Sequence, residues 1–223
     1  MLDWQNIDTV MLDMDGTLLD LHFDTYYWLH HLPQRYADIK GVSLTQAKDV
    51  IYPKLTAQKG TLNWYCLDYW QQEFDIDIVA LKKEIDHKVQ LLPGTEDFLN
   101  WLTTTNKRIF LVTNAHSGSL AVKQPHARLE RWLHGIYLSH DYGYAKEEQG
   151  FWAALQEDIG YDAERSLMVD DNLQVLGAAQ ESGIGHLLAV SEPDSQRPAQ
   201  HTGDFNSVAH LGLAIPATET SKW

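Results

Sequence analysis

Two aspartates, Asp13 and Asp15, flank Met14 directly after a short apolar run at residues 9–12. The run is rich in residues that favour β-structure, so it predicts a buried strand. Alternation along the strand directs both carboxylates toward the same side, where the sheet opens. Two neighbouring carboxylates repel each other unless a cation or a shared proton compensates them. The pair is therefore a candidate for cation binding or proton transfer.

A second pair, Asp170 and Asp171, follows another predicted buried strand at residues 166–169. A single aspartate at a strand end more often caps a helix, but two separate pairs make that explanation weaker. Three or four carboxylate oxygens at one edge of a sheet suit a hard cation, and Mg²⁺ is the natural occupant. The two pairs together predict a magnesium site.

The elements that must position these residues alternate along the chain. Each predicted strand ends in polar residues and is followed by a helical pattern, which is typical of an α/β fold with a parallel sheet covered on both faces. Ligands of such folds bind at the carboxyl ends of the strands. The remaining strands are predicted at residues 109–112, 186–190 and, more weakly, 135–139, and the helices at 95–102, 147–159 and 173–182.

One interval, residues 21–92, breaks this alternation. It contains no convincing buried strand and is too long for a loop, so it predicts an inserted helical domain. The α/β core would then comprise residues 1–20 and 93–223, ending in an irregular segment with one short helix. Helical patterns in the insert cover residues 25–36, 44–58, 63–74 and 78–89.

Composition narrows the class of protein. The 223 residues include 31 Asp and Glu against 17 Lys and Arg, a net charge of −14, which argues against nucleic acid and anionic membranes as partners. The single cysteine, Cys66, excludes an internal disulfide and fits a reducing compartment. Without a membrane-length apolar run or a basic leader, we expect a cytoplasmic protein, either monomer or dimer.

Four short sequence motifs follow one another along the chain. Residues 13–17, DMDGT, match the DxDGT signature of the haloacid dehalogenase (HAD) superfamily of phosphatases. Thr113 lies in LVTN, Lys146 in GYAKEE, and the second aspartate pair in MVDDN, as in the three later motifs of that superfamily. The chain resembles this superfamily over nearly its whole length. The resemblance implies a Rossmann-like core, with the helical insert as a cap domain.

The resemblance also implies roles for individual residues. Asp13 would be the nucleophile that forms an aspartyl-phosphate, and Asp15 the general acid and base. Lys146 would supply positive charge to the nucleophile and the phosphoryl group. The Thr113 hydroxyl and the Asn114 backbone N–H would hold phosphate oxygens.

For the metal, the resemblance implies Mg²⁺ held by the Asp13 side chain, the Asp15 carbonyl and Asp170, with Asp171 acting through water. An acid/base aspartate at position 15 favours phosphoryl transfer over dehalogenation. Phosphoglucomutase-like members also keep both aspartates, so motif content alone leaves them open.

A closer resemblance concerns the substrate. The strings MLDMDGTLLD, LNWYCLDYW, TNAH, LAVK and GYAKE are similar to the proteobacterial GMP/IMP nucleotidase branch of the superfamily, which implies purine 5′-nucleotides as substrates. Aromatic cap residues could stack on a base and polar ones read its edge, although packing between helices is the commoner role for aromatic residues. The cap candidates are Asn63, Trp64, Tyr65 and Asp68. His116 and Lys123 could approach substrate or face solvent.

Two alternatives to a purine nucleotidase stay open. One is a small-metabolite phosphatase that acts on sugar phosphates or phosphoglycolate, and the other is a catalytically silent module that binds a phosphate ligand. A substrate panel separates the first, and the complete absence of turnover would indicate the second.

Overall fold

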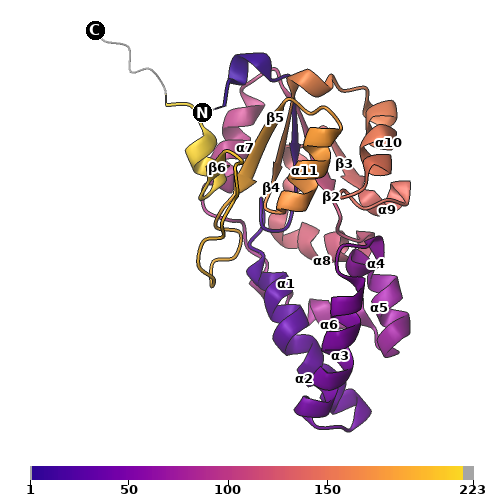
Figure 1. The fold of residues 1–223 in the computed structure, drawn as a ribbon. Helices are drawn as coiled ribbons and strands as arrows, with labels where there is room; N and C mark the ends of the chain where they lie inside the picture. The colour runs from indigo at the N-terminus through magenta and orange to yellow at the C-terminus, as the bar shows by residue number, and fades with distance from the viewer. Residues whose placement is uncertain (1, 218–223) are drawn as a thin grey trace.

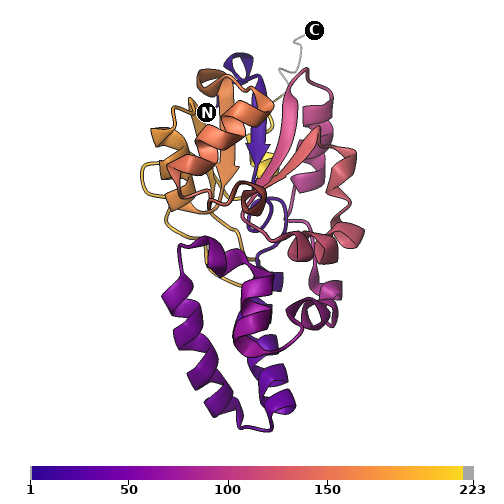
Figure 2. The same cartoon turned by 90° about the vertical axis from the view of Figure 1, so that its right-hand side faces the viewer.

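The computed structural model describes residues 2–217, which form two parts (Figure 1). They are called the α/β layer and the helical layer below, and the helical layer consists of the helices between residues 22 and 88. An α/β layer holds a six-stranded parallel sheet in the order β3-β2-β1-β4-β5-β6, and a helical layer extends from one end of it. The view turned by 90° shows the same separation (Figure 2). The predicted fold class is thereby confirmed, whereas the residue limits of the two domains stay a prediction.

The strand at the centre of the sheet is β1 (Thr9–Leu12), which pairs with β2 (Arg108–Thr113) on one side and β4 (Ser166–Asp170) on the other. Because the three strands run parallel and in register, the residues that follow them meet at one edge. The outer strands are β3 (Gly135–Leu138), β5 (His186–Val190) and β6 (Ser207–Val208). Chain order reverses on the two sides of β1, and open α/β sheets bind their ligands at such a switch point.

Each face of the sheet buries its own apolar cluster. Val10 and Leu12 pack toward α7 (Thr95–Thr103) and α8 (Ser117–Ala127), while Met11 packs toward the other face. That second face is covered by α10 (Gln149–Ile159) and α11 (Leu173–Glu181). The period-two alternation of a strand explains this division. The short helix α9 (Ser139–Tyr142) follows β3.

The helical layer differs in detail from its predicted pattern. The first predicted helix is longer and has a π-helical segment, the third is broken at Cys66, and the fourth ends early in a 3₁₀ turn. The observed elements are α1 (His22–Tyr26), a π-helix (Tyr27–His31), α2 (Leu32–Lys40), α3 (Leu44–Gln58), α4 (Leu62–Tyr65), α5 (Leu67–Phe74), α6 (Ile78–Lys83) and a 3₁₀-helix (Asp86–Lys88).

The break at Cys66 has a local cause. Its backbone is extended, and its Sγ accepts from the N–H of Tyr69, so Cys66 caps α5 instead of continuing α4. The buried Trp70 indole donates to the carbonyl of Trp64 (2.9 Å). This carbonyl thereby gains a donor in place of the helical backbone N–H that the interruption removes.

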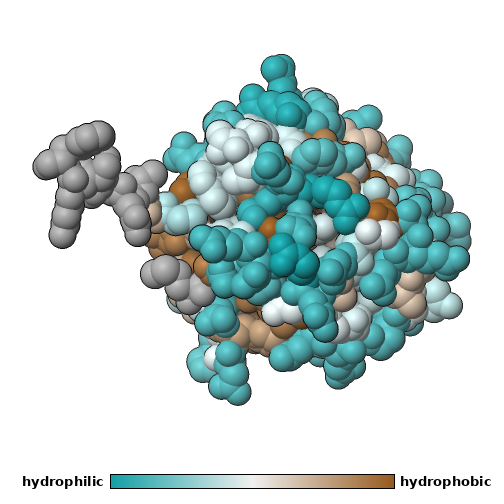
Figure 3. Space-filling model, turned by 90° about the horizontal axis from the view of Figure 1, so that it is seen from above, coloured by the Kyte–Doolittle hydropathy of each residue, from teal (hydrophilic) through white to brown (hydrophobic). Residues whose placement is uncertain are grey.

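The segment after β5 is more ordered than predicted. It contributes β6 to the sheet edge and a 3₁₀-helix (Leu211–Ala214) that packs on α7. Further 3₁₀ turns lie at Trp4–Asn6, Leu129–Arg131 and Ala163–Arg165. Hydrophilic residues dominate the end of the molecule away from the helical layer (Figure 3). Among the described residues, every helix is too short or too polar to cross a membrane.

Candidate active site

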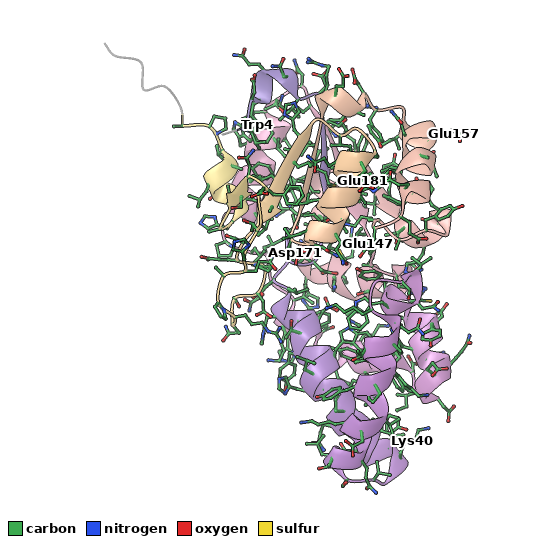
Figure 4. All side chains as sticks on the ribbon, viewed as in Figure 1. Trp4, Lys40, Glu147, Glu157, Asp171 and Glu181 are labelled. Atoms are coloured by element: carbon green, nitrogen blue, oxygen red, sulfur yellow. The ribbon has the colours of Figure 1, made fainter. Side chains whose placement is uncertain are left out.

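A cavity of about 690 Å³ lies between the two layers, at the carboxyl ends of β1, β2 and β4. Asp13, Thr113 and Asp170 line it from the sheet, and Trp28 and Trp64 line it from the helical layer. Figure 4 shows two further lining residues, Glu147 and Asp171, at the junction of the layers, whereas Lys40 lies at the far tip of the helical layer. The cavity therefore coincides with the edge at which the motif residues were expected.

Lys146 is the central cation of this site. Its buried Nζ donates to Asp13 Oδ1 (2.5 Å), to Asp170 Oδ2 (2.7 Å) and to the carbonyl of Val112 (3.0 Å). Burial alone would lower the pKa of Lys146, but the two carboxylates raise it above its usual value. The ammonium group is therefore charged at neutral pH and neutralises the predicted nucleophile.

Asp13, Asp170 and Asp171 offer carboxylate oxygens that lie within 4.8 Å of one another. Burial, with Asp170 nearby, raises the pKa of Asp13 to about 6 against the opposing effect of Lys146. Burial and the other two carboxylates likewise raise the pKa of Asp171 well above its usual value. One lysine cannot balance three carboxylates, so the cluster has the charge and the oxygen donors that fit Mg²⁺.

Asp15 has a different cationic partner. Its Oδ2 accepts a hydrogen bond from Lys123 Nζ at 2.6 Å, and it is absent from the carboxylate cluster found among the described residues. Burial raises the pKa of Asp15 to about 6, while Lys123 opposes the shift. Two aspartates separated by one residue thus occupy distinct environments, as a nucleophile and an acid/base must.

Gly16 brings the chain close to the second aspartate pair. Its φ of +87° lies in the left-handed region, and a Cβ at this position would come within 2.6 Å of Asp171 Cγ. Only glycine can make this turn without strain and without displacing a carboxylate.

Thr113 ends β2, Asn114 follows it, and both are buried. The Thr113 hydroxyl oxygen accepts from the N–H of Ala115 (3.0 Å) and keeps its own proton to donate. The Asn114 side chain accepts from the backbone N–H of Lys146 (2.9 Å) and donates to Glu147 (2.8 Å). This asparagine therefore orients the loop that carries the lysine.

Sequence reasoning missed Glu147, whose carboxylate joins the two layers. Besides Asn114, it accepts from the Asn172 side chain (3.1 Å) and from the Tyr65 hydroxyl of the helical layer (2.8 Å). Glu147 directly follows the motif lysine, Lys146, in the sequence. This position was the available signal, because an acidic residue there must lie at the same edge of the sheet as the lysine.

The four cap candidates divide into two pairs. Trp64 and Tyr65 line the cavity. Asn63 and Asp68 are not among its described lining residues. Asn63 donates to Gln58 (3.3 Å), and the exposed Asp68 lies 3.6 Å from His116 Nε2. Lining residues that the sequence did not suggest include Trp28, Lys59, Gln174, Arg197 and Gln200.

The alternative that Lys123 faces solvent is wrong. Lys123 projects from α8 into the interior, where Asp15 and Asp24 each accept from its Nζ at 2.6 Å. His116 lines the cavity and caps α8, accepting from the N–H of Gly118 (3.2 Å). Other positions of α8, such as Val122, are also buried. A lysine on the core-facing side of a helix is rarely buried without a partner, so its place there was the available signal for an ion pair.

The fold and this site define a hydrolase: the model of the haloacid dehalogenase-like hydrolases matches residues 7–183, and the chain belongs to this family. The resemblance inferred from the four motifs is confirmed. A protein of Escherichia coli K12 and one of Shigella flexneri, each called GMP/IMP nucleotidase YrfG, are 42% identical to the chain over 192 residues, 86% of either chain.

Two solved structures share the fold. A HAD phosphatase from Thermococcus onnurineus has a TM-score of 0.75 at 19% identity, and covers 92% of this chain and 94% of its own. The L-2-haloacid dehalogenase from Xanthobacter autotrophicus has a TM-score of 0.65 at 14% identity, covering 93% and 96%. At these identities the likeness concerns the fold alone.

Proposed function

We propose that this protein is a Mg²⁺-dependent phosphomonoesterase that hydrolyses the purine 5′-nucleotides GMP and IMP through an aspartyl-phosphate on Asp13. The observation that carries the proposal is the buried Lys146 ammonium bridging Asp13 and Asp170 at the floor of the cavity. A carboxylate with a fixed cationic partner at the carboxyl end of the central strand is suited to attack an anionic phosphate ester, because the lysine offsets the repulsion between them.

In the first step, an Asp13 oxygen attacks phosphorus, the bond from phosphorus to the ester oxygen breaks, and Asp15 gives its proton to the departing alcohol. In the second step, Asp15 takes a proton from water as the water oxygen attacks phosphorus, which releases phosphate and regenerates Asp13. The Thr113 hydroxyl and the Asn114 backbone N–H would bind non-bridging oxygens throughout.

The residues for the metal are Asp13 and Asp170 through their carboxylates and Asp15 through its carbonyl, with Asp171 acting through water. Bound Mg²⁺ would supply the positive charge that one lysine leaves uncompensated among three carboxylates and a phosphate dianion.

Preference for a purine rests on two supports. The relatives called GMP/IMP nucleotidase are 42% identical to the chain. The cavity is large enough for a nucleotide-sized ligand and is lined by Trp28, Trp64 and Tyr65, whose rings can pack against a flat base.

A phosphate-release screen of the purified protein tests this function. With Mg²⁺, we expect kcat/KM for GMP and IMP to exceed that for glucose 6-phosphate and phosphoglycolate by about 100-fold or more, because a shaped pocket binds only the purine in the transition state. EDTA should abolish turnover and added Mg²⁺ restore it. Faster hydrolysis of the sugar phosphate would indicate a small-metabolite phosphatase, and no turnover of any ester would indicate a silent binding module.

Gly16→Ala should raise the Mg²⁺ concentration needed for half-maximal activity by about tenfold, within the range expected when the support of a metal ligand is disturbed. The reason is that the new methyl group must displace Asp171. The measurement is a Mg²⁺ titration of phosphate release. Gly177→Ala is the matched control, because a Cβ at Gly177 on α11 meets open space. An unchanged titration for Gly16→Ala would remove Asp171 from the metal site.

A further inference from the structure

A row of four charged groups of alternating sign, two buried lysines and two partly exposed aspartates, crosses the boundary between the layers. Lys123 of α8 donates to Asp15 of the α/β layer and to Asp24 of α1, both at 2.6 Å. Asp24 in turn accepts from Lys82 of α6 at 2.5 Å. The row therefore begins at the predicted acid/base and ends inside the helical layer.

These charges are held firmly. Lys123 and Lys82 are each only 1% exposed, and the Lys82 ammonium lies over the rings of Phe23, Tyr27 and Trp28 at 5.0, 4.6 and 5.5 Å. Buried charges of this kind persist only when they are paired, and the pairing fixes their geometry.

The two carboxylate oxygens of Asp15 are not equivalent. Oδ2 is bound to Lys123, whereas Oδ1 is buried and has no hydrogen-bond partner among the described residues. Asp15 lines the cavity, so the free oxygen belongs to a carboxylate that can reach a bound ester. An unpartnered buried oxygen at a site of proton transfer calls for a function.

We propose that Lys123 is a positioning residue: it anchors Asp15 Oδ2 so that Oδ1 exchanges the proton with the ester oxygen, and Asp24 holds Lys123 in that place from the helical layer. The inference rests on the proposed phosphomonoesterase activity. As Asp13 attacks phosphorus, the bond to the ester oxygen breaks and the proton on Oδ1 moves to that oxygen. Asp15 is left as a carboxylate beside the Lys123 ammonium, and in the second step Oδ1 recovers a proton from the attacking water.

This arrangement links the position of the general acid, Asp15, to the position of the helical layer over the cavity. Lys123 and Asp15 belong to the α/β layer, but the second carboxylate that fixes the lysine belongs to α1. When the helical layer is displaced, Lys123 loses Asp24, and Asp15 is then held by a lysine with only one anchor. Proton transfer is thus best aligned when the cavity is covered.

The test compares two esters in Lys123→Met. IMP has an alkoxide leaving group that needs a proton, whereas 4-nitrophenyl phosphate has a leaving group that departs without one. The parameter is kcat/KM, which reports steps only through formation of the aspartyl-phosphate. We expect kcat/KM for IMP to fall by about 100-fold or more, the usual contribution of general acid catalysis, and that for 4-nitrophenyl phosphate by much less.

Asp24→Asn should change the ratio of the two kcat/KM values in the same direction but by less, because Lys123 keeps Asp15. If Lys123→Met does not fold, the double variant Lys123→Met/Asp24→Asn removes one charge of each sign and is measured in the same way. Lys40→Met is the matched control, since Lys40 pairs with the exposed Asp75 at the far tip of the helical layer.

Equal losses for both esters, or no loss for either, would overturn the proposal, because a structural or general electrostatic role does not distinguish leaving groups. The parent protein separates this failure from failure of the proposed function. If the parent hydrolyses neither ester, the phosphomonoesterase assignment is wrong, and the positioning role falls with it.

Discussion

Asp13→Asn should lower kcat for GMP and IMP by about 10⁴-fold or more, as expected when the nucleophile of a covalent mechanism is removed. The amide is isosteric with the carboxylate but cannot form the phosphoryl intermediate. Because the amide oxygen can still accept a hydrogen bond from Lys146, the packing of the site should survive. The measurement is phosphate release at saturating substrate and Mg²⁺, together with a search for phosphate bound to the protein after rapid acid quenching.

The control for Asp13→Asn is Asp38→Asn, at an exposed residue of α2 that pairs with Arg35. It should keep the parent kcat, since surface ion pairs contribute little. Circular dichroism should show the same thermal transition for Asp13→Asn and the parent to within a few degrees. Phosphate release by Asp13→Asn near the parent rate would exclude Asp13 as the nucleophile.

The helices that the sequence predicted best are those with local start and stop signals. The observed α3 begins and ends where predicted, because Ser43 and Gln46 form a capping box and the helix ends just before Lys59-Gly60. The pattern at residues 63–74 gave no sign of the break at Cys66. At that break the Cys66 thiol caps α5 and the Trp70 indole satisfies the Trp64 carbonyl, and periodicity shows neither contact.

The strands, too, divide into those with a local sequence signal and those without one. The strands with four or more residues were predicted, because each is an apolar run with polar residues after it; β3, whose residues are mostly only partly buried, gave the weakest signal. The two-residue strand β6 was missed, since two residues carry no period and pair with β5 only because the chain returns to that edge.

For the site, the sequence predicted correctly that the residues at the carboxyl ends of the parallel strands meet. Asp13, Thr113 and Asp170 meet because β1, β2 and β4 are neighbours in register. The partners of Asp15 could not be found in this way. Lys123 is 108 residues away on a helix, and its second partner Asp24 belongs to the helical layer, so the contact depends on how the two layers pack.

Lys146→Met should affect both chemistry and stability. Loss of the ammonium leaves Asp13 and Asp170 buried with no cation between them, so the free energy of unfolding without Mg²⁺ should fall by about 3–5 kcal/mol, as for one half of a buried ion pair. The kcat/KM for IMP should fall by about 10³-fold, because this charge offsets repulsion in the transition state. Urea denaturation in EDTA and phosphate release with Mg²⁺ measure the two effects.

Mg²⁺ should restore part of the stability of Lys146→Met but little of its activity. The cation can compensate the carboxylates, whereas it cannot occupy the place of an ammonium that touches Asp13, Asp170 and the Val112 carbonyl together. Lys54→Met is the control, because the half-exposed Lys54 pairs with Glu73 on the surface and should change stability by about 1 kcal/mol or less. A Lys146→Met protein as stable in EDTA as the control would mean that Asp13 and Asp170 are not ionised together beside Lys146, and the charge balance that underlies the magnesium site would then be wrong.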